Sequence, residues 1–293
     1  MEIFGLPFPV LMGQIVVGLV NGCFYAVLSL GLAVIFGMLN IVNFVHGAIY
    51  MLGALLAWLL LDRLGVSYWY SLIIVPLLIG AVGCALERTM LRRLYRIDHV
   101  FGILLTLGLA YIIEGLARYW FGAAGMAFSA PPQFAGTFDM GFMRLPKYRV
   151  WVIVISLAVC LSTWALIERT RLGSYLRAAT ENPAIARTFG INVSVLVTLT
   201  YGLGVALAGF AGVLAAPIYQ VSPIMGSSLI IVVFAVVVIG GMGSILGSIL
   251  TGLLLGLVEG VTRAYWPEAS AVVIFIVMIL VLILRPSGLF GKE

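Results

Sequence analysis

Residues 227–261 read SSLIIVVFAVVVIGGMGSILGSILTGLLLGLVEGV, and Glu259 is their only charged residue. A helix needs roughly 20 mostly apolar residues to cross the hydrocarbon core of a bilayer. As one continuous helix these 35 residues would extend over roughly 52 Å, whereas two full crossings need about 60 Å. The segment therefore predicts two membrane helices, at least one of them short or re-entrant, with a break at the glycines that follow Ile239.

Other long apolar segments occur along the whole chain, at residues 11–37, 43–61, 70–86, 100–121, 150–167, 193–216 and 266–284. The chain is 63% hydrophobic and only 9% charged, with a mean hydropathy of +1.20, which is far from the composition of soluble domains. The segments lack the inside–outside alternation of a membrane β-barrel. We expect an all-α, polytopic integral membrane protein with eight or nine transmembrane segments, forming one domain over residues 1–293.

The net charge of +5 comes from cations at the ends of the apolar segments, so it does not indicate nucleic-acid binding. Ten of the sixteen Lys and Arg residues belong to two loops and the C-terminus, namely Arg88, Arg92, Arg93, Arg96, Arg169, Arg171, Arg177, Arg187, Arg285 and Lys292. The positive-inside rule places these regions in the cytoplasm. The loop 122–148 then faces outward, and an odd number of spans would put the N-terminus outside.

The glycine break, GGMGS at residues 240–244, has two interpretations. Broken helices inside a membrane often line a transport pathway, because exposed backbone there must face a cavity or other protein. Ser244 could cap the second half-helix, and Gly240, Gly241 and Ser244 are then candidate pathway residues. The alternative is a tight turn at the membrane edge.

A second candidate for the translocation pathway is the polar group formed by Asn40, Asn43 and His46. These residues are three apart, so they would share one face if the region were helical. Polar groups at membrane depth usually face the interior of the bundle or a water path. Their alternative role is to hold a helix break together by hydrogen bonds.

Small residues recur at every fourth position after the break, at Ser244, Ser248, Gly252, Gly256 and Gly260. Such a stripe lets another helix backbone approach closely, either within the chain or at a subunit interface. We expect Gly256→Leu to disrupt folding or assembly and Leu255→Ala to be tolerated.

Two acid–base pairs, Glu114 with Arg118 and Glu259 with Arg263, have the favourable i,i+4 order near outward helix ends. They are interpreted as helix-packing residues that lock neighbouring helices. A proton-coupled carrier is the alternative function, with Glu114, Glu259 and His46 as its relay.

The loop 168–192 is a charged, helix-capable segment between two apolar spans. Asn182 and Pro183 split it into two short helices, since Asn can cap the second and Pro needs no donor in a first turn. Gly190 is expected to end the second helix. A soluble partner could bind this surface. The candidate contact residues are Arg177, Glu181, Asn182, Ala186, Arg187 and Gly190.

Five motifs in order resemble the LivH-type permeases of branched-chain amino acid ABC importers. They are NFVHGAIYMLG at 43–53, TLGLA at 106–110, the loop residues from Arg177 to Asn192, GGMGSILG at 240–247 and RPSGLFG at 285–291. The resemblance implies a bacterial inner-membrane permease that pairs with a LivM-type sister, two cytoplasmic ATPases and a periplasmic substrate-binding protein. The loop 168–192 would then form the coupling helices.

The chain itself is not expected to be an enzyme or to bind a cofactor. It lacks the Gly-rich phosphate loop of ATPases, so the ATP would be used by partner subunits. Its two His and three Cys residues have no metal-ligand spacing, and no metal site is expected. The resemblance implies transport of branched-chain amino acids or a related amide, urea or other small polar solute by alternating access.

Overall fold

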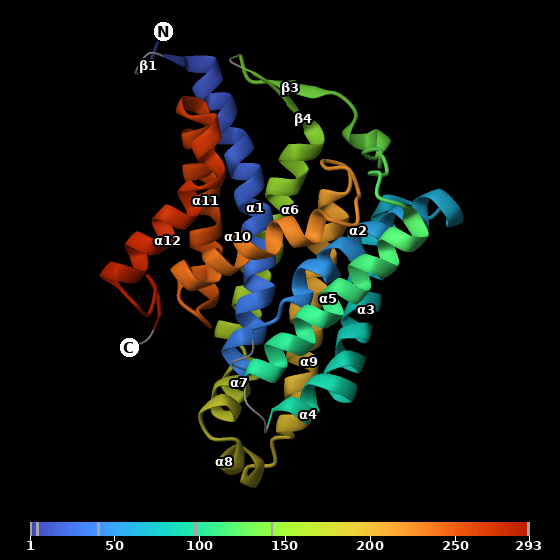
Figure 1. Ribbon diagram of the computed structural model, residues 1–293, viewed down its shortest axis with the longest axis vertical. Coiled ribbons are helices and arrows are strands. Elements are labelled where there is room, and N and C mark those ends of the chain that lie inside the picture. Colours follow the sequence, from blue (N-terminus) through green and yellow to red (C-terminus); the bar gives the residue numbers. More distant parts are fainter. Residues whose placement is uncertain (1, 4–5, 40–41, 96–98, 142, 292–293) are drawn as a thin grey trace.

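The structure is a computed structural model that describes residues 2–3, 6–39, 42–95, 99–141 and 143–291. Figure 1 shows a bundle of helices with two short hairpins at one end. The α-helices are α1 (Phe8–Leu39), α2 (Val45–Leu64), α3 (Tyr68–Leu86), α4 (Arg92–Leu94), α5 (His99–Phe121), α6 (Lys147–Glu168), α7 (Arg171–Glu181), α8 (Pro183–Thr188), α9 (Val193–Ala215), α10 (Met225–Gly240), α11 (Ile245–Tyr265) and α12 (Val273–Leu284). The predicted all-α fold is confirmed.

Shorter elements connect these helices. A π-helical turn, η1 (Glu87–Leu91), joins α3 to α4, and two 3-10 turns are η2 (Pro132–Phe134) and η3 (Pro267–Ala271). Strands β1 (Glu2–Ile3) and β2 (Leu6–Pro7) pair antiparallel, as do β3 (Thr137–Asp139) and β4 (Arg144–Pro146).

Seven helices of the described residues are long and apolar enough to cross a membrane: α1, α2, α3 with its extension into α4, α5, α6, α9 and α11. Two apolar helices, α10 and α12, are shorter. This agrees with the predicted eight or nine segments, and it confirms that the chain is a multi-pass membrane protein. The predicted division of residues 227–261 is also present, since α10 ends at Gly240 and α11 begins at Ile245.

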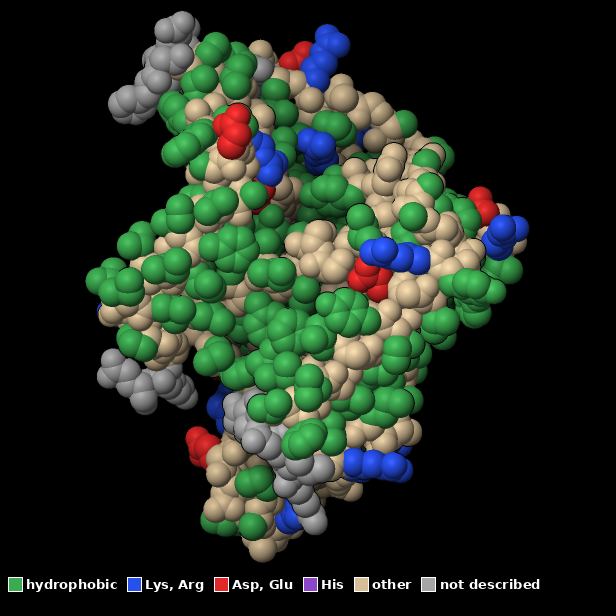
Figure 2. All heavy atoms as spheres, viewed as in Figure 1, with side chains coloured by type: hydrophobic (Ala, Val, Ile, Leu, Met, Phe, Trp, Pro, Cys, Tyr) green, Lys and Arg blue, Asp and Glu red, His purple; other side chains and the backbone are tan. Residues whose placement is uncertain are grey.

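Helix α1 lies at the centre of the bundle. It packs along α11 and also contacts α9, α6 and α10. In its most apolar window 83% of residues are buried, against 17% in α5, so α5 belongs to the periphery. Figure 2 shows hydrophobic side chains over most of the middle of one face, as expected for a surface that lipid or another membrane subunit covers.

The stripe of small residues on α11 packs within the chain, against glycines of α1. A side chain added at Gly256 would meet the backbone at Gly22 and Gly18, and one added at Gly252 would come within 2.6 Å of the Ala26 backbone nitrogen. The close approach of two backbones explains why α1 and α11 make such an extensive contact. Of the two interpretations of the stripe, the structure therefore supports intrachain packing.

The proposed tolerance of Leu255→Ala does not fit the structure. Leu255 is 2% exposed and belongs to a second apolar cluster, formed with residues of α10 and α12. Truncating a buried leucine leaves a cavity, so Leu255 is not neutral even though it lies off the glycine stripe. Leu254, which is 53% exposed, is the suitable control.

The two ends of the molecule differ in the elements that they carry (Figure 1). The N-terminus and the β3–β4 hairpin lie at one end, and α4, α7 and α8 lie at the other. The arginine-rich loops thus share one end, opposite the loop 122–148 and the N-terminus, as the predicted topology requires. The C-terminal segment joins the α7 end, because its backbone donates to the end of α10, from Leu289 to Ile239 and from Phe290 to Gly240.

Candidate coupling and translocation sites

The charged loop 168–192 folds into the predicted pair of short helices, α7 and α8. Asn182 Oδ1 accepts a hydrogen bond from the Ile185 amide at 3.1 Å, and Pro183 occupies the first position of α8. Gly190 ends α8 with a φ of +79°, and the Ile191 amide then donates back to the Ala186 carbonyl at 3.2 Å. This helix-ending pattern needs a left-handed residue, which glycine supplies without strain.

The side chains of this segment divide into an inner and an outer set. Gly173, Leu176 and Ala179 hold α7 against the bundle, and Ala186 is also buried, at 3% exposure. Among the predicted contact residues Ala186 therefore packs inside this chain, and it is the one buried residue of α8. The outer set consists of Arg177, Glu181, Arg187, Ile185 and Phe189. The last two are 54% and 81% exposed, an apolar tip at the end of the molecule.

Helix α7 borders a cavity of about 430 Å³ that also includes the second part of the glycine break, Met242–Ser244, but not Gly240 or Gly241. Arg177 and Glu181 contribute from α7, Gly37 from the end of α1, and Gly243 and Ser244 from the start of α11. Ser244 Oγ accepts from the Gly247 amide at 3.1 Å, which confirms the predicted cap. This part of the break therefore lies beside α7 and the end of α1.

Asn43, just before α2, and His46, in its first turn, hold the start of α2 against α9 and α1. Asn43 Nδ2 donates to the Tyr201 hydroxyl at 3.2 Å, and His46 Nε2 lies 3.0 Å from the Leu28 carbonyl. Both side chains are buried, and Asn43 precedes the helix, so the two do not share a helical face. Asn40 lies outside the described residues. These contacts support the structural role, although Asn43 Oδ1 and His46 Nδ1 have no hydrogen-bond partner among the described residues.

The two predicted ion pairs form but differ in setting. Glu114 and Arg118 lie 2.6 Å apart on peripheral α5, and within the described residues they bond no other helix, contrary to the predicted locking role. Glu259 is 8% exposed, pairs with Arg263 and also accepts from Tyr25 of α1 at 2.7 Å. Only the second pair ties helices together. A shared proton relay with His46 is not formed, because each group has its own separate partners.

Glu259 and Arg263 also border a cavity of about 510 Å³ in the half of the molecule that carries the β3–β4 hairpin. Its polar lining includes Tyr25, Tyr50, Arg149 and Tyr219. The Tyr219 hydroxyl donates to Asn21 Oδ1 at 2.7 Å. Burial and the nearby Glu259 carboxylate raise the pKa of Tyr219 to about 12, so this phenol stays protonated as a donor.

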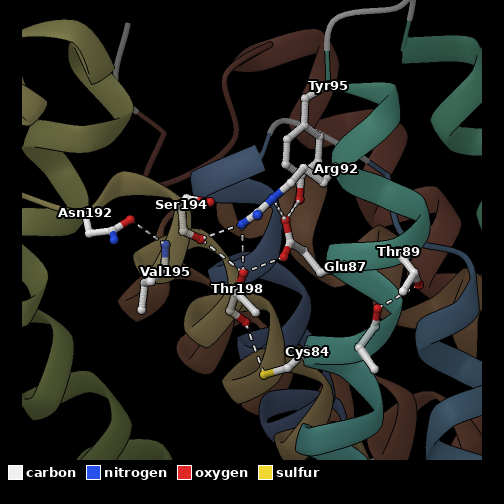
Figure 3. Close-up of polar contacts among 10 residues, drawn as sticks. Cys84, Glu87, Thr89, Arg92, Tyr95, Asn192, Ser194, Val195 and Thr198 are labelled. Carbon is white, nitrogen blue, oxygen red and sulfur yellow. Dashed lines mark hydrogen bonds and ion pairs between the residues drawn. The ribbon is translucent and has the colours of Figure 1, made fainter.

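Glu87 forms a buried polar network that the sequence analysis missed (Figure 3). Its carboxylate accepts from Thr198 at 2.5 Å and from Tyr95 at 2.9 Å, and Arg92 lies 3.5 Å away. Arg92 also donates to the Ser194 carbonyl at 3.0 Å, so the network joins η1 and α4 to the first turns of α9. Burial and the Glu87 carboxylate raise the pKa of the Tyr95 phenol well above its usual range.

A sequence signal for this network exists, although it is weak. Glu87 is a lone acid at the end of an apolar span, followed by Arg92 five residues later. That spacing puts two side chains together in a π-turn but not in an α-helix. Since α9 begins where the loop 168–192 ends, the network links the candidate coupling segment to α3.

These features define a class: a polytopic α-helical membrane protein with internal polar cavities and an exposed two-helix segment at one end. The family model described as "Branched-chain amino acid transport system / permease component" matches residues 14–282. The chain belongs to this family of transport permeases, which is a family of transport components and not of enzymes.

Individual relatives agree along nearly the whole chain. The high-affinity branched-chain amino acid transport system permease protein LivH of Escherichia coli (strain K12) is 27% identical, covering 94% of each chain. The corresponding BraD of Pseudomonas aeruginosa is 30% identical, covering 95% of each. The LivM protein of the same E. coli strain is 30% identical over 90% of this chain and 67% of its own length. The family resemblance seen in the sequence is confirmed, and it favours the permease over the carrier alternative. No solved structure matched the chain.

Proposed function

We propose that this chain is the membrane-spanning subunit of an ATP-driven importer in a bacterial inner membrane. It carries branched-chain amino acids, or a closely related small polar solute, by alternating between outward- and inward-facing states. The chain contributes no chemistry of its own; ATP is hydrolysed on two separate cytoplasmic ATPase subunits. A LivM-type sister permease and a periplasmic substrate-binding protein complete the assembly.

The observation that carries this proposal is the exposed α7–α8 segment on a chain of the permease family. The exposed side chains of this segment include the apolar Ile185 and Phe189 and the charged Arg177, Glu181 and Arg187. An apolar anchor surrounded by charge is typical of a specific protein contact. The anchor is rigid, because Asn182 and Gly190 fix both ends of α8.

Phe189→Ala tests the coupling role without disturbing the core. The Phe189 ring is 81% exposed, so its loss should not unfold the chain, whereas an aromatic anchor of an interface typically contributes about 2 kcal/mol or more. We expect at least about a tenfold loss of ATP-driven uptake and of ATPase subunits that co-purify from the native membrane in mild detergent.

Arg177→Glu should act in the same direction, since it reverses an exposed charge of this segment and also breaks the 3.3 Å ion pair between Arg177 and Glu168 of α6. Arg93→Glu, an exposed cation of α4 at the same end, is the matched control and should leave both readouts near wild type. Wild-type uptake that survives without any ATPase subunit would contradict the proposal. Unchanged uptake in both Phe189→Ala and Arg177→Glu would contradict the docking site alone.

A further inference from the structure

The cavity of about 510 Å³ beside Glu259 has the size and lining of a small-molecule site. Sites for small molecules have volumes of roughly 300–1,000 Å³ and combine apolar walls with a few polar groups. Its walls come from α1, α2, α6, α10, α11 and the loop that follows α9. Six segments of a transport permease thus meet around one hollow.

Tyr50 places a buried hydroxyl without a hydrogen-bond partner beside the cavity. The residue is 1% exposed and borders the cavity, and its hydroxyl has no hydrogen-bond partner among the described residues. Leaving such a hydroxyl unpaired costs about 1–3 kcal/mol. A leucine or phenylalanine would avoid that cost at this position, and the Tyr50 hydroxyl is therefore available to a ligand that enters the cavity.

The cavity contains charged groups that can bind an anionic and a cationic group of the same ligand. Arg149, the third residue of α6, forms no ion pair with any described residue. Arg263 uses one nitrogen for Glu259 and keeps further donors, since a guanidinium carries five N–H groups. The nearly buried Glu259 carboxylate accepts from Tyr25 and Arg263 and, with about four acceptor sites, can still take another donor.

Apolar side chains complete the lining beside these charges. Val20 and Phe24 contribute from α1, Ile224 from the loop before α10, and Leu229 from α10 itself. An ion alone would gain nothing from such walls. A solute with a charged head and an aliphatic side chain would use both halves of the cavity.

We propose that this cavity binds the solute of the proposed function, a branched-chain amino acid, while it is in transit through this chain. Arg149 and Arg263 receive the carboxylate, Glu259 and the Tyr50 hydroxyl receive the ammonium group, and Val20, Phe24 and Leu229 contact the side chain. This assignment rests on the proposed transport function and adds to it a site inside this chain, separate from the specificity of the binding protein.

The test measures binding of radiolabelled L-leucine to the assembled importer in lipid nanodiscs, with the substrate-binding protein omitted. We expect saturable binding that leucinamide and 4-methylpentanoate displace about tenfold or more less well than leucine, because each lacks one charge. Tyr50→Phe removes only the unpaired hydroxyl and should weaken binding about fivefold. Glu259→Gln should weaken it about tenfold or more.

The control uses the second ion pair of identical spacing. Glu114→Gln on peripheral α5 should leave leucine binding unchanged, since Glu114 lies outside the cavity. Basal ATPase activity of every variant reports intact assembly. Failure of wild type to bind leucine, or unaltered affinity in both Tyr50→Phe and Glu259→Gln, would overturn the cavity assignment. If the wild-type importer showed no ATP-driven uptake, the proposed function would be overturned instead.

Discussion

Glu87 is a buried acidic side chain with several polar partners. Three donors from Tyr95, Arg92 and Thr198 converge on a carboxylate that has no exposed surface. A buried charge is tolerated only when such partners surround it. The network thus holds the end of α3 to the start of α9, directly beside the loop that carries α7 and α8.

Glu87→Ala is expected to destabilise the protein by about 1–3 kcal/mol, because it leaves buried donors without an acceptor. The measurement is the midpoint of thermal unfolding in detergent, with intrinsic fluorescence as the signal for unfolding. Thr89→Ala is the matched control from the same turn, since the exposed Thr89 hydroxyl bonds only the Ala85 carbonyl. Equal midpoints for the two variants would show that the network contributes no stability.

At the scale of elements, the contact between α1 and α11 decides the fold. Gly18 and Gly22 of α1 lie against Gly256 and Gly260 of α11, so two backbones touch where side chains would normally stand. In a bilayer this close packing replaces the hydrophobic effect as the driving force between helices. The bundle therefore depends on residues that lack side chains more than on those that have them.

Gly256→Leu should prevent α1 and α11 from closing, because the new side chain would overlap the Gly22 backbone. We expect loss of the monodisperse peak in fluorescence-detected size-exclusion chromatography. Leu254→Ala, two positions away on the exposed side of α11, should elute as wild type. A Gly256→Leu variant with a normal elution profile and thermal midpoint would refute the packing argument.

Which of these elements the sequence predicts depends on the range of the interaction. Apolar runs, the break after Ile239 and the caps at Asn182 and Ser244 are local features, and all were predicted correctly. Contacts between distant segments were not predicted. Tyr25 and Glu259 are 234 positions apart, and no periodicity in either helix indicates that they meet.

The same limit explains the errors at the candidate sites. The small-residue stripe predicted a close helix contact but not that its partner was α1. Ala186 is predicted as an apolar contact to a partner, whereas the register of α8 turns it inward. Tyr50 gave no signal, since a tyrosine in an apolar span is ordinary until its unpaired hydroxyl is seen.

At the scale of the whole molecule, the two ends are set apart by their charges and connections. The arginine-rich turns around α4, α7 and α8 share one end, and the β3–β4 hairpin with the N-terminus occupies the other (Figure 1). Helix α9 starts beside the Glu87 network and ends just before the loop of Tyr219, which borders the cavity of about 510 Å³. Its 23 residues span roughly 35 Å, so one continuous helix connects the end of the candidate coupling loop with this cavity.

Sidedness can be tested with single cysteines, because the native Cys23 and Cys160 are buried and Cys84 is only partly exposed. With all three replaced by alanine, we expect Met140→Cys to react with a membrane-impermeant maleimide in right-side-out vesicles. Phe189→Cys should react only in inside-out vesicles, because positive residues retain their loops in the cytoplasm. Both positions are exposed, at 43% and 81%, so access rather than burial decides the labelling. The reverse pattern would invert the topology and remove α8 from the reach of a cytoplasmic ATPase.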